Sequence, residues 1–354
     1  MRGQAPQTRA AWYTDAMSGE PRFGFAVVNV GAERALKAEI KHVEKGAKLA
    51  FSRPGLITFK AGGIDERFAS ASVIARVRGL SLGMAESIDD VLRFAGEKPA
   101  VLHVFARDTT EDGASEVDDA WAVEVRGKLG ASRRFVMDRA PKNGERVLDV
   151  ICAATEATFV GAHLHGPGRW AHAGGRVAIE VPEGAPSRAY RKLEEALAWS
   201  GLRLKAGVTA VEIGAAPGGA ALALARRGIS VLAIDPALMD AGVLAFEGPG
   251  GARVTHLAKA AGGIDPEDIP KKTELLLMDA NLAPPIALRY FAHVAAIASA
   301  AETAILTLKI NDDAMLNAIP KQLARLKALG WTDVIATRLP SNRSEICVVA
   351  KRKR

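Results

Sequence analysis

Val211-Glu212-Ile213-Gly214-Ala215-Ala216-Pro217-Gly218-Gly219 is a glycine-rich stretch that follows the apolar run Thr209 to Ile213 and precedes a helical pattern from Ala220 to Arg227. A strand, a glycine turn and a helix in this order suit a ligand, because glycines let it approach the backbone closely. A second apolar run, Ile229 to Ile234, ends in Asp235, and an acidic residue at that place suits ribose hydroxyls. The stretch therefore predicts a site for a nucleoside-type cofactor, and a tight turn without a ligand is the alternative.

The turn differs from two common phosphate-binding patterns. It reads G-A-x-P-G-G rather than G-x-G-x-x-G, and Pro217 removes a backbone amide that a pyrophosphate could use. No Lys-Ser or Lys-Thr pair follows it, as a P-loop would need. We therefore expect adenosyl-methionine rather than a dinucleotide or ATP.

The length and composition of the chain limit the class of protein. A chain of 354 residues with 49% apolar residues favours two globular domains. Its two cysteines, Cys152 and Cys347, lack CxxC spacing, which excludes a disulfide scaffold and a cysteine-rich zinc site and fits a reducing cytoplasm. No uncharged apolar span is long enough for a transmembrane helix, and the N-terminus lacks the apolar region of a secretory signal.

The net charge of +7 is unevenly distributed along the chain. Residues 184–354 carry +6 of it, partly through the terminal run Lys351-Arg352-Lys353-Arg354. A basic excess in the half that holds the glycine turn favours a polyanionic partner such as RNA. Ordinary solvated surface charge is the alternative.

The first half predicts a mixed α+β domain with a small sheet. We expect residues 1–20 to form a poorly ordered arm and residues 21–183 to form this domain. Its predicted strands are residues 24–29, 56–59, 72–77, 100–105, 147–151, 158–162 and 176–181, and its predicted helices are residues 32–44, 87–95 and 118–129. Residues 109–116 have the composition of a polar loop, and residues 182–186 that of a linker.

A turn-rich segment near the end of this half contains His163, His165 and His172. No carboxylate or cysteine joins them at ligand spacing, so we expect no metal there. In the same segment, Arg169 and Trp170 could stack on RNA or could pack in the interior, and the sequence leaves both open.

The second half, residues 184–354, alternates strands and helices, which predicts a doubly wound sheet with ligands at the carboxyl ends of its strands. Two apolar strands end in Asp279 and Lys309, and a third begins with Glu345. Lys192 lies on a helix before the glycine turn, for which Ser187 is a plausible cap. A later helix over residues 312–329 is expected to kink or break at Pro320.

In their order along the chain these residues resemble the FtsJ/RrmJ-type ribose 2′-O-methyltransferases, which use a Lys-Asp-Lys-Glu tetrad. The first lysine matches Ser187-Arg-Ala-Tyr-Arg-Lys192-Leu-Glu-Glu, and the cofactor turn matches Val211 to Gly219. The aspartate matches Leu277-Met-Asp279-Ala-Asn281, the second lysine matches Leu306-Thr-Leu-Lys309, and the glutamate matches Ser341-Asn-Arg-Ser-Glu345. The resemblance thus implies a Rossmann-like methyltransferase fold.

The resemblance also implies roles for individual residues. The implied catalytic set is Lys192, Asp279, Lys309 and Glu345. The implied cofactor-binding set is Glu212, Gly214, Ala216, Pro217, Gly218, Gly219, Asp235 and Asp279. Glu212 stands where the family usually has an aspartate near the methionine amino group. The family's acid after the third strand is missing, because Lys259-Ala260 occupy its place.

Such a tetrad makes chemical sense. A ribose 2′-hydroxyl is a weak nucleophile, so the protein must orient it and remove its proton. A lysine acts as the base only if its pKa falls from the free value of about 10.4 towards neutrality. We expect Asp279 and Glu345 to position the two lysines, and Lys309 to be either the base or the group that orients the hydroxyl.

Two other methylation chemistries fit less well. Cytosine C5 methylation needs a nucleophilic cysteine near a strand end, and neither Cys152 nor Cys347 stands there. Amino-group methylation usually shows Asn/Asp-Pro-Pro-aromatic, whereas Pro284-Pro285 are separated from Asp279 and precede Ile286.

The run from Val160 to Glu195 resembles, more narrowly, the RlmM group of bacterial 23S rRNA methyltransferases. That resemblance implies a THUMP RNA-binding domain in residues 21–183, ribosomal (23S) RNA as the substrate and a cytoplasmic location. A methyltransferase of tRNA or another RNA, and a catalytically silent RNA-binding relative, are the alternatives. We expect no metal, no membrane and no protein partner.

Overall fold

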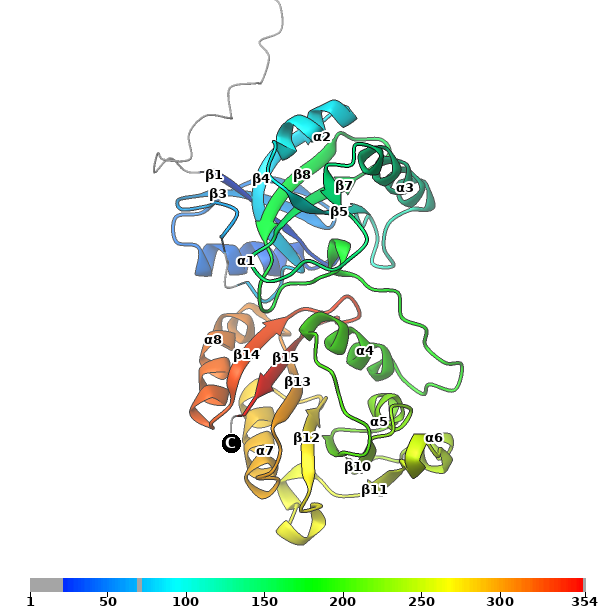
Figure 1. The fold of residues 1–354 in the computed structure, drawn as a ribbon. Coiled ribbons are helices and arrows are strands. Elements are labelled where there is room, and N and C mark those ends of the chain that lie inside the picture. Colours follow the sequence, from blue (N-terminus) through cyan, green and yellow to red (C-terminus); the bar gives the residue numbers. More distant parts are fainter. Residues whose placement is uncertain (1–21, 69–71, 353–354) are drawn as a thin grey trace, which may run out of the picture.

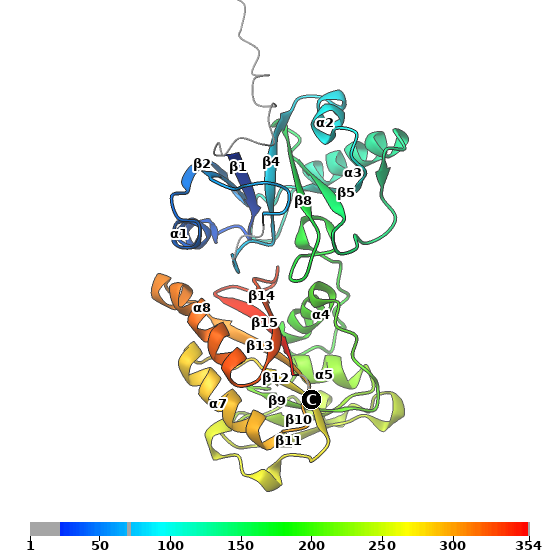
Figure 2. The same ribbon diagram turned by 60° about the vertical axis from the view of Figure 1, so that its left-hand side comes forward.

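The computed structural model describes residues 22–68 and 72–352. It contains two sheets with helices packed on them, one built from residues 22–164 and the other from residues 209–351 (Figures 1 and 2). The α/β class with a mostly parallel second sheet is confirmed. The predicted arm at residues 1–20 lies outside the described residues, and the division at residues 183 and 184 remains a prediction.

The first sheet has eight strands in the order β2-β3-β1-β4-β8-β7-β5-β6. They are β1 (Arg22–Val27), β2 (Lys48–Arg53), β3 (Leu56–Ala61), β4 (Val77–Ala85), β5 (Ala100–Ala106), β6 (Phe135–Val136), β7 (Arg146–Cys152) and β8 (Thr158–Leu164). The helices of this half are α1 (Glu33–Val43), α2 (Ile88–Ala95) and α3 (Glu116–Ala131). A sheet of eight strands is larger than the small one expected, because three strands were not predicted. The exposed edge strand β2 and the two-residue strand β6 carry little hydrophobic pattern, and the predicted strand at residues 72–77 reaches only the first residue of β4.

Two predicted strands of this half are wrong. Residues 72–76 form a loop, because the carboxylate of Glu39 accepts the backbone N–H groups of Val73 (2.7 Å) and Ile74 (3.3 Å) in place of a neighbouring strand. Residues 176–181 pair with no strand, and the Arg176 side chain instead binds the Asp108 carboxylate. In both segments the alternating pattern belongs to a chain that lies outside the sheet.

The second sheet has seven strands in the order β11-β10-β9-β12-β13-β15-β14. They are β9 (Thr209–Ile213), β10 (Ser230–Ile234), β11 (Val254–Leu257), β12 (Thr273–Met278), β13 (Thr303–Lys309), β14 (Thr332–Thr337) and β15 (Glu345–Lys351). The first five strands in this order are parallel to one another, whereas β15 runs antiparallel to both β13 and β14. The predicted doubly wound arrangement is therefore confirmed.

The helices of this half cover both faces of the second sheet. They are α4 (Ala189–Ser200), α5 (Gly219–Ala225), α6 (Ala241–Ala245), α7 (Pro284–Ile297) and α8 (Asp313–Ala328). Short 3-10 turns of this half are η2 (Pro249–Gly251), η3 (Ala261–Gly263) and η4 (Pro266–Asp268), and η1 (Ala173–Gly175) belongs to the first half. Figure 1 shows α7 and α8 on one side of the strands, with α4 and α5 on the other.

Alternate side chains of the central strand β12 enter two different cores. Leu276 and Met278 belong to the apolar cluster that includes α7 and α8, whereas Leu275 and Leu277 belong to the cluster that includes α4 and α5. A strand covered on both faces is apolar at nearly every position, which explains the run Leu275 to Met278. The first of these clusters also includes side chains of the N-terminal sheet, and α1 packs against α8. The two halves therefore share an apolar contact.

Two local predictions for the second half need correction. Arg188, rather than Ser187, is the N-cap of α4, and it makes no side-chain capping hydrogen bond; the Ser187 hydroxyl accepts only from the Ala189 amide, at 3.3 Å. Helix α8 runs without a break through Pro320. Buried Ile319 and Leu326 hold the helix against the sheet on both sides of the proline, so packing outweighs the lost hydrogen bond. No helix in the part of the chain that the structure describes is both long and apolar enough to cross a membrane.

Trp331 allows a test of the core around α7. Its side chain is fully buried, its ring lies 5.5 Å from that of Phe291, and its Nε1 has no hydrogen-bond partner. We expect Trp331→Ala to lower the free energy of unfolding by about 3–5 kcal/mol, and Trp331→Phe to cost about half as much because the phenyl ring still fills most of the space and neither variant loses a hydrogen bond. Urea denaturation measures both, with the exposed Val123→Ala as control. Equal losses for the two Trp331 variants would contradict this account.

Candidate active site

The antiparallel register of β13 and β15 places a lysine beside a glutamate. Lys309, the last residue of β13, pairs in register with Glu345, the first residue of β15. Their side chains meet, with Nζ of Lys309 2.5 Å from Oε2 of Glu345. If β15 ran parallel to β13, its first residue would lie at the opposite edge of the sheet. The direction of β15 therefore creates this pair.

Two more charged residues complete a cluster at the same edge. Lys192 reaches it from α4, and Asp279 follows the end of β12, next to β13. The Nζ atom of Lys192 lies 3.0 Å from Oδ2 of Asp279 and 2.6 Å from Oε1 of Glu345. All four residues of the predicted catalytic set thus form one chain of ion pairs, Asp279–Lys192–Glu345–Lys309. We refer to these four residues as the tetrad.

Burial and charge set the protonation of the tetrad. The Glu345 side chain is only 5% exposed, and burial would raise the pKa of its carboxyl. The hydrogen bonds from Lys192 and Lys309 outweigh burial and lower that pKa to about 2. Burial would likewise lower the pKa of the Lys192 ammonium, but Asp279 and Glu345 raise it above its ordinary value. Lys192 is therefore a fixed positive charge at neutral pH.

The glycine turn between β9 and α5 passes close to the tetrad. Gly214 has φ +78°, and a Cβ there would lie 2.8 Å from the carbonyl oxygen of Asp279. Gly218 has φ +114°, and a Cβ there would lie 2.9 Å from Cε of Met239. A Cβ on Gly219 would overlap the Ser187 hydroxyl. Glycine is thus required for both conformation and space, and the turn lies directly against the backbone of a tetrad residue.

Asp235 follows β10 and lies against this turn. Its carboxylate accepts the backbone N–H of Ala216 at 3.1 Å and that of Ala237 at 2.8 Å. The bond Ala216–Pro217 is cis. The structure therefore brings the predicted cofactor residues after β9 and β10 together, with Asp235 bonded to the turn itself.

Glu212 lies inside the sheet on β9. It is 1% exposed, and its Oε2 atom has no hydrogen-bond partner. Burial raises the pKa of this carboxyl well above its ordinary value, and the nearby charges of Asp279 and Asp235 raise it further. A buried acid without a full set of partners is costly, so a ligand with a donor or a positive charge would stabilise it.

The position of the missing acid after β11 is occupied by an ion pair. Lys259 binds Asp268 at 2.7 Å and Asp265 at 3.5 Å. Both acids lie at the short turn η4. The structure thus places carboxylates near this position, but each of them faces the lysine.

Several residues that support the tetrad were not predicted. Asn342 donates to Oε1 of Glu345 at 3.4 Å, and Glu195 accepts the backbone N–H of Ser341 at 3.0 Å. Asn29, from the N-terminal half, donates to carbonyl oxygens in the same loop. Glu195 could have been found in the sequence, because it stands one helical turn after Lys192. The sequence holds no local signal for the contact of Asn29.

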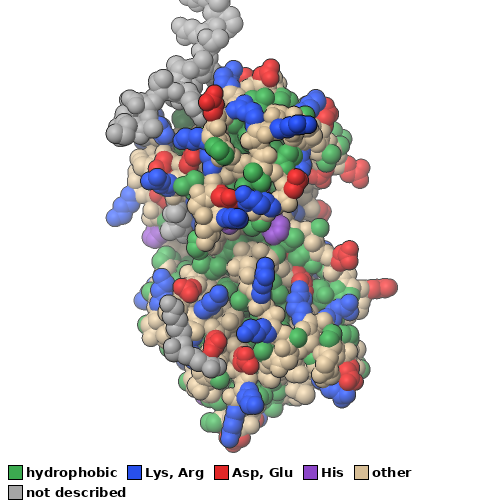
Figure 3. Space-filling model, in the orientation of Figure 1, with side chains coloured by type: hydrophobic (Ala, Val, Ile, Leu, Met, Phe, Trp, Pro, Cys, Tyr) green, Lys and Arg blue, Asp and Glu red, His purple; other side chains and the backbone are tan. Residues whose placement is uncertain are grey.

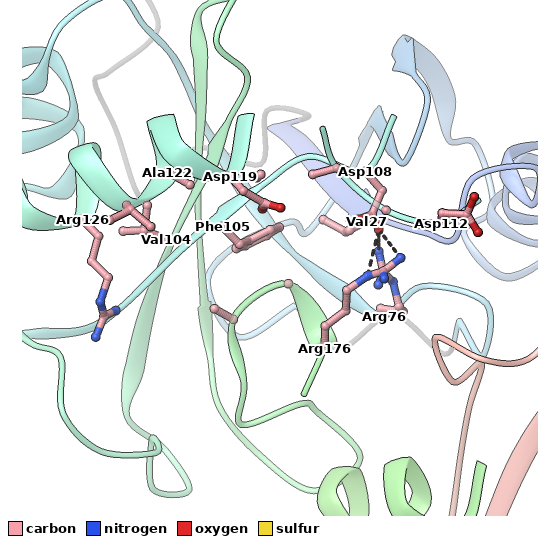
Figure 4. Close-up of a pocket in the computed structure, with 16 residues that line it drawn as sticks. Val27, Arg76, Val104, Phe105, Asp108, Asp112, Asp119, Ala122, Arg126 and Arg176 are labelled. Carbon is pink, nitrogen blue, oxygen red and sulfur yellow. Dashed lines mark hydrogen bonds and ion pairs between the residues drawn. The ribbon is translucent and has the colours of Figure 1, made fainter. Parts of the chain in front are cut away.

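The N-terminal half contains a cavity of its own. A cavity of about 500 Å³ lies between α3 and η1, with Phe105 and Ala122 among its apolar lining (Figure 4). On one side Arg76 and Arg176 both bind the carboxylate of Asp108. No tetrad residue lines this cavity. It is separate from the cluster at the sheet edge.

The segment rich in histidine belongs to the interior. Trp170 is 2% exposed, and Arg169 donates to the backbone oxygens of Arg78 (2.7 Å) and Phe68 (2.5 Å). This supports packing and contradicts stacking on RNA for these two residues. His163 binds the buried carboxylate of Asp149 at 2.6 Å. Within residues 22–68 and 72–352, no three His, Cys, Asp or Glu side chains are grouped as a metal site requires.

Comparison with known proteins adds a second line of evidence. The chain is similar to the ribosomal RNA large subunit methyltransferases M of three bacteria. The identities are 35% over 139 residues for Chromohalobacter salexigens, 31% over 174 residues for Tolumonas auensis and 32% over 168 residues for Shewanella sediminis. These matches cover 37%, 46% and 45% of this chain, and 35%, 46% and 44% of the respective relatives. The resemblance of the sequence to the RlmM group is confirmed. The matched region spans less than half the length of these relatives.

Likeness to solved structures is weaker. A chain of a fibrillarin/Nop5p complex aligns with a TM-score of 0.36 at 17% identity, covering 47% of this chain and 83% of that one. The 1,6-didemethyltoxoflavin-N1-methyltransferase of Burkholderia thailandensis aligns with a TM-score of 0.32 at 17% identity, covering 49% and 80%. Scores this low carry no functional argument. No family model matches the chain.

The depressed pKa of Glu345 predicts how the tetrad responds to acid. A carboxyl whose folded pKa lies below its unfolded value stabilises the fold above the unfolded pKa and loses this contribution as the pH falls through the folded one. Between the ordinary value of 4.5 and about 2, we expect the stability difference between the wild type and Glu345→Gln to shrink by on the order of 3 kcal/mol. Urea denaturation across this pH range measures it. A constant difference would contradict the ion-pair geometry.

Proposed function

We propose that this chain is an adenosyl-methionine-dependent ribose 2′-O-methyltransferase that acts on ribosomal RNA of the large subunit. The tetrad carries the proposal: Lys192, Asp279, Lys309 and Glu345 form one network at the carboxyl edge of a doubly wound sheet. The names and sequences of the similar ribosomal RNA methyltransferases support it.

The glycine turn and its two acids fit adenosyl-methionine. The turn from Gly214 to Gly219 packs so closely on its neighbours that only glycine fits at its contacts, and this places its backbone beside the tetrad. We assign Asp235 to the ribose hydroxyls and the orphaned carboxyl of Glu212 to the amino group of the methionine part. When bound, the cofactor supplies a methyl group already activated on a sulfonium.

The protein residues would then prepare the ribose hydroxyl. As the oxygen gains the methyl group, its proton has to leave, and Lys309 at the end of β13 either takes that proton or orients the hydroxyl. Lys192 keeps its charge between Asp279 and Glu345, so it acts as a fixed counter-ion and not as the base. Glu345 holds both ammonium groups in place.

We also propose that the N-terminal half, residues 21–183, contributes to RNA binding as a THUMP-like module and that the protein works in the cytoplasm. The resemblance to the RlmM group supports both statements. Figure 3 shows basic side chains on both halves of one face, with hydrophobic side chains gathered at the waist between them. Basic groups on both sides of a waist suit an RNA that contacts both halves.

Another RNA, such as tRNA, is the second candidate substrate. A catalytically silent RNA-binding protein is an alternative function. Neither of the two has a specific observation in its favour. The complete tetrad argues against a silent protein, because a relative without activity has no need for two half-buried lysines that share one buried acid.

The test of the proposal is Lys309→Ala. We expect the rate of methyl transfer to ribosomal RNA to fall by about 10²–10⁴-fold, because positioning and proton removal are lost, while affinity for the demethylated cofactor stays unchanged. Mapping of 2′-O-methyl sites on total RNA, with and without the wild-type protein, identifies the substrate. The exposed Lys321→Ala is the matched control. Turnover of Lys309→Ala near the wild-type rate at saturating RNA would overturn the assignment.

Glu212 predicts a pH dependence of cofactor binding. Its raised pKa means that the free protein holds a proton there under mildly acidic conditions. A bound ammonium favours the carboxylate, so binding expels this proton, and affinity for the demethylated cofactor should rise as the pH increases above the ordinary carboxyl pKa of 4.5. Calorimetry in buffers of different ionisation enthalpy measures the released proton. The variant Glu212→Gln should bind more weakly and without this pH dependence, and an unchanged dependence would refute the role.

A further inference from the structure

Asn29 joins the N-terminal half to the loop that leads into Glu345. It lies two residues after the end of β1, and it is 8% exposed. Its side-chain amide donates to the carbonyl oxygens of Leu339 (3.0 Å), Pro340 (3.1 Å) and Asn342 (3.3 Å). One amide group with two hydrogens thus lies among three acceptors, so at least one hydrogen is shared between two carbonyl oxygens.

The loop that Asn29 holds is in direct contact with the tetrad. The Asn342 side chain accepts the backbone N–H of Leu339 at 2.8 Å and donates to Oε1 of Glu345 at 3.4 Å. The backbone N–H of Asn342 donates back to the oxygen of Leu339 at 3.0 Å. The loop is therefore a closed turn, and one of its side chains ends on the carboxylate that binds both lysines.

A second anchor comes from α4. Oε2 of the buried Glu195 accepts from the backbone N–H of Ser341 (3.0 Å) and from its hydroxyl (2.7 Å). Glu195 stands three residues after Lys192, so one face of this helix holds both the loop and the tetrad. The loop is thus held from two sides, by Glu195 of its own half and by Asn29 of the other half.

We propose that Asn29 is a positioning residue, through which the N-terminal half holds the loop at residues 339–342 and with it Glu345 in the geometry that the tetrad needs. This inference rests on the proposed function for its effect on catalysis. Its structural part stands on the hydrogen bonds alone. The methyl-transfer step then depends on the docking of the two halves as well as on RNA binding.

Three variants test this inference. Asn29→Ala removes the donor, whereas Asn29→Asp keeps the shape but turns an oxygen towards three carbonyl oxygens, so it should be at least as damaging. The exposed Asn143→Ala makes the same chemical change elsewhere in the N-terminal half and serves as control.

The first measurement does not depend on activity. Hydrogen exchange of the full-length protein reports on three backbone amides of this loop: those of Leu339 and Asn342 are bonded within the loop, and that of Ser341 is bonded to Glu195. We expect faster exchange in this segment for both Asn29 variants and no change for Asn143→Ala. Unchanged exchange in the segment would overturn the positioning role, whatever the protein methylates.

The second measurement is single-turnover methylation at saturating RNA and cofactor. We expect both Asn29 variants to lower the rate constant by about 10–100-fold, because a misplaced catalytic group costs this much, with binding of the demethylated cofactor and of RNA unchanged. A loss confined to RNA affinity, or an unchanged rate with an active wild type, would overturn the inference. A wild type that methylates no RNA refutes the proposed function instead and leaves the exchange measurement to decide.

A variant in the other half covers the case in which both Asn29 variants fail to fold. Asn342→Ala leaves the carbonyl oxygens that Asn29 binds but removes the next step of the link, the side-chain bonds of Asn342 to Leu339 and Glu345, so it should give the same rise in exchange and the same loss of rate. In the double variant Asn29→Ala/Asn342→Ala, the two losses of rate should not add, because both substitutions interrupt the same connection between Asn29 and Glu345. Additive losses would show two independent effects and would contradict the link.

Discussion

The carboxylate of Glu345, shared by two lysines, is the interaction on which the candidate site depends. Each lysine comes from a different element, Lys192 from α4 and Lys309 from β13. Two ammonium groups would repel each other at this edge without an acid between them. Because Glu345 is almost completely buried, its attraction to both is weakly screened by water. The antiparallel strand β15 is what brings this acid to the carboxyl edge, where parallel strands deliver only their last residues.

The N-terminal half offers an instructive contrast. There, too, two cationic side chains share one carboxylate, since Arg76 and Arg176 both bind Asp108. These arginines cannot lose a proton near neutral pH, whereas a lysine can act as a base under suitable conditions. The cavity beside Asp108 therefore has the size for a ligand, but its ion pairs lack a group for proton transfer. A group able to transfer a proton, and not the volume of a cavity, therefore distinguishes the tetrad from the site beside Asp108.

The sequence predicted the members of the site better than their support. Asp279, Lys309 and Glu345 could be found because a polar residue at the end of an apolar strand is visible in a short window, and Lys192 followed from the resemblance. Asn29 could not be found, because its partners lie more than 300 residues away and an asparagine after a strand is ordinary. The same limit explains the predicted strand at residues 176–181, where alternation was present but no neighbouring strand was available.

The support of the tetrad also explains why the two halves have to meet at this edge. Glu195 and Lys192 are on the same face of α4, so any shift of this helix moves the lysine and the loop together. Asn29 constrains the loop at residues 339–342 from outside the second sheet. The apolar cluster that the two halves share helps to keep Asn29 in contact with this loop. A network of buried polar groups is stable only when nearly all of its members are satisfied. The tetrad therefore takes its geometry from three directions at once: the register of β15, the face of α4 and the end of β1.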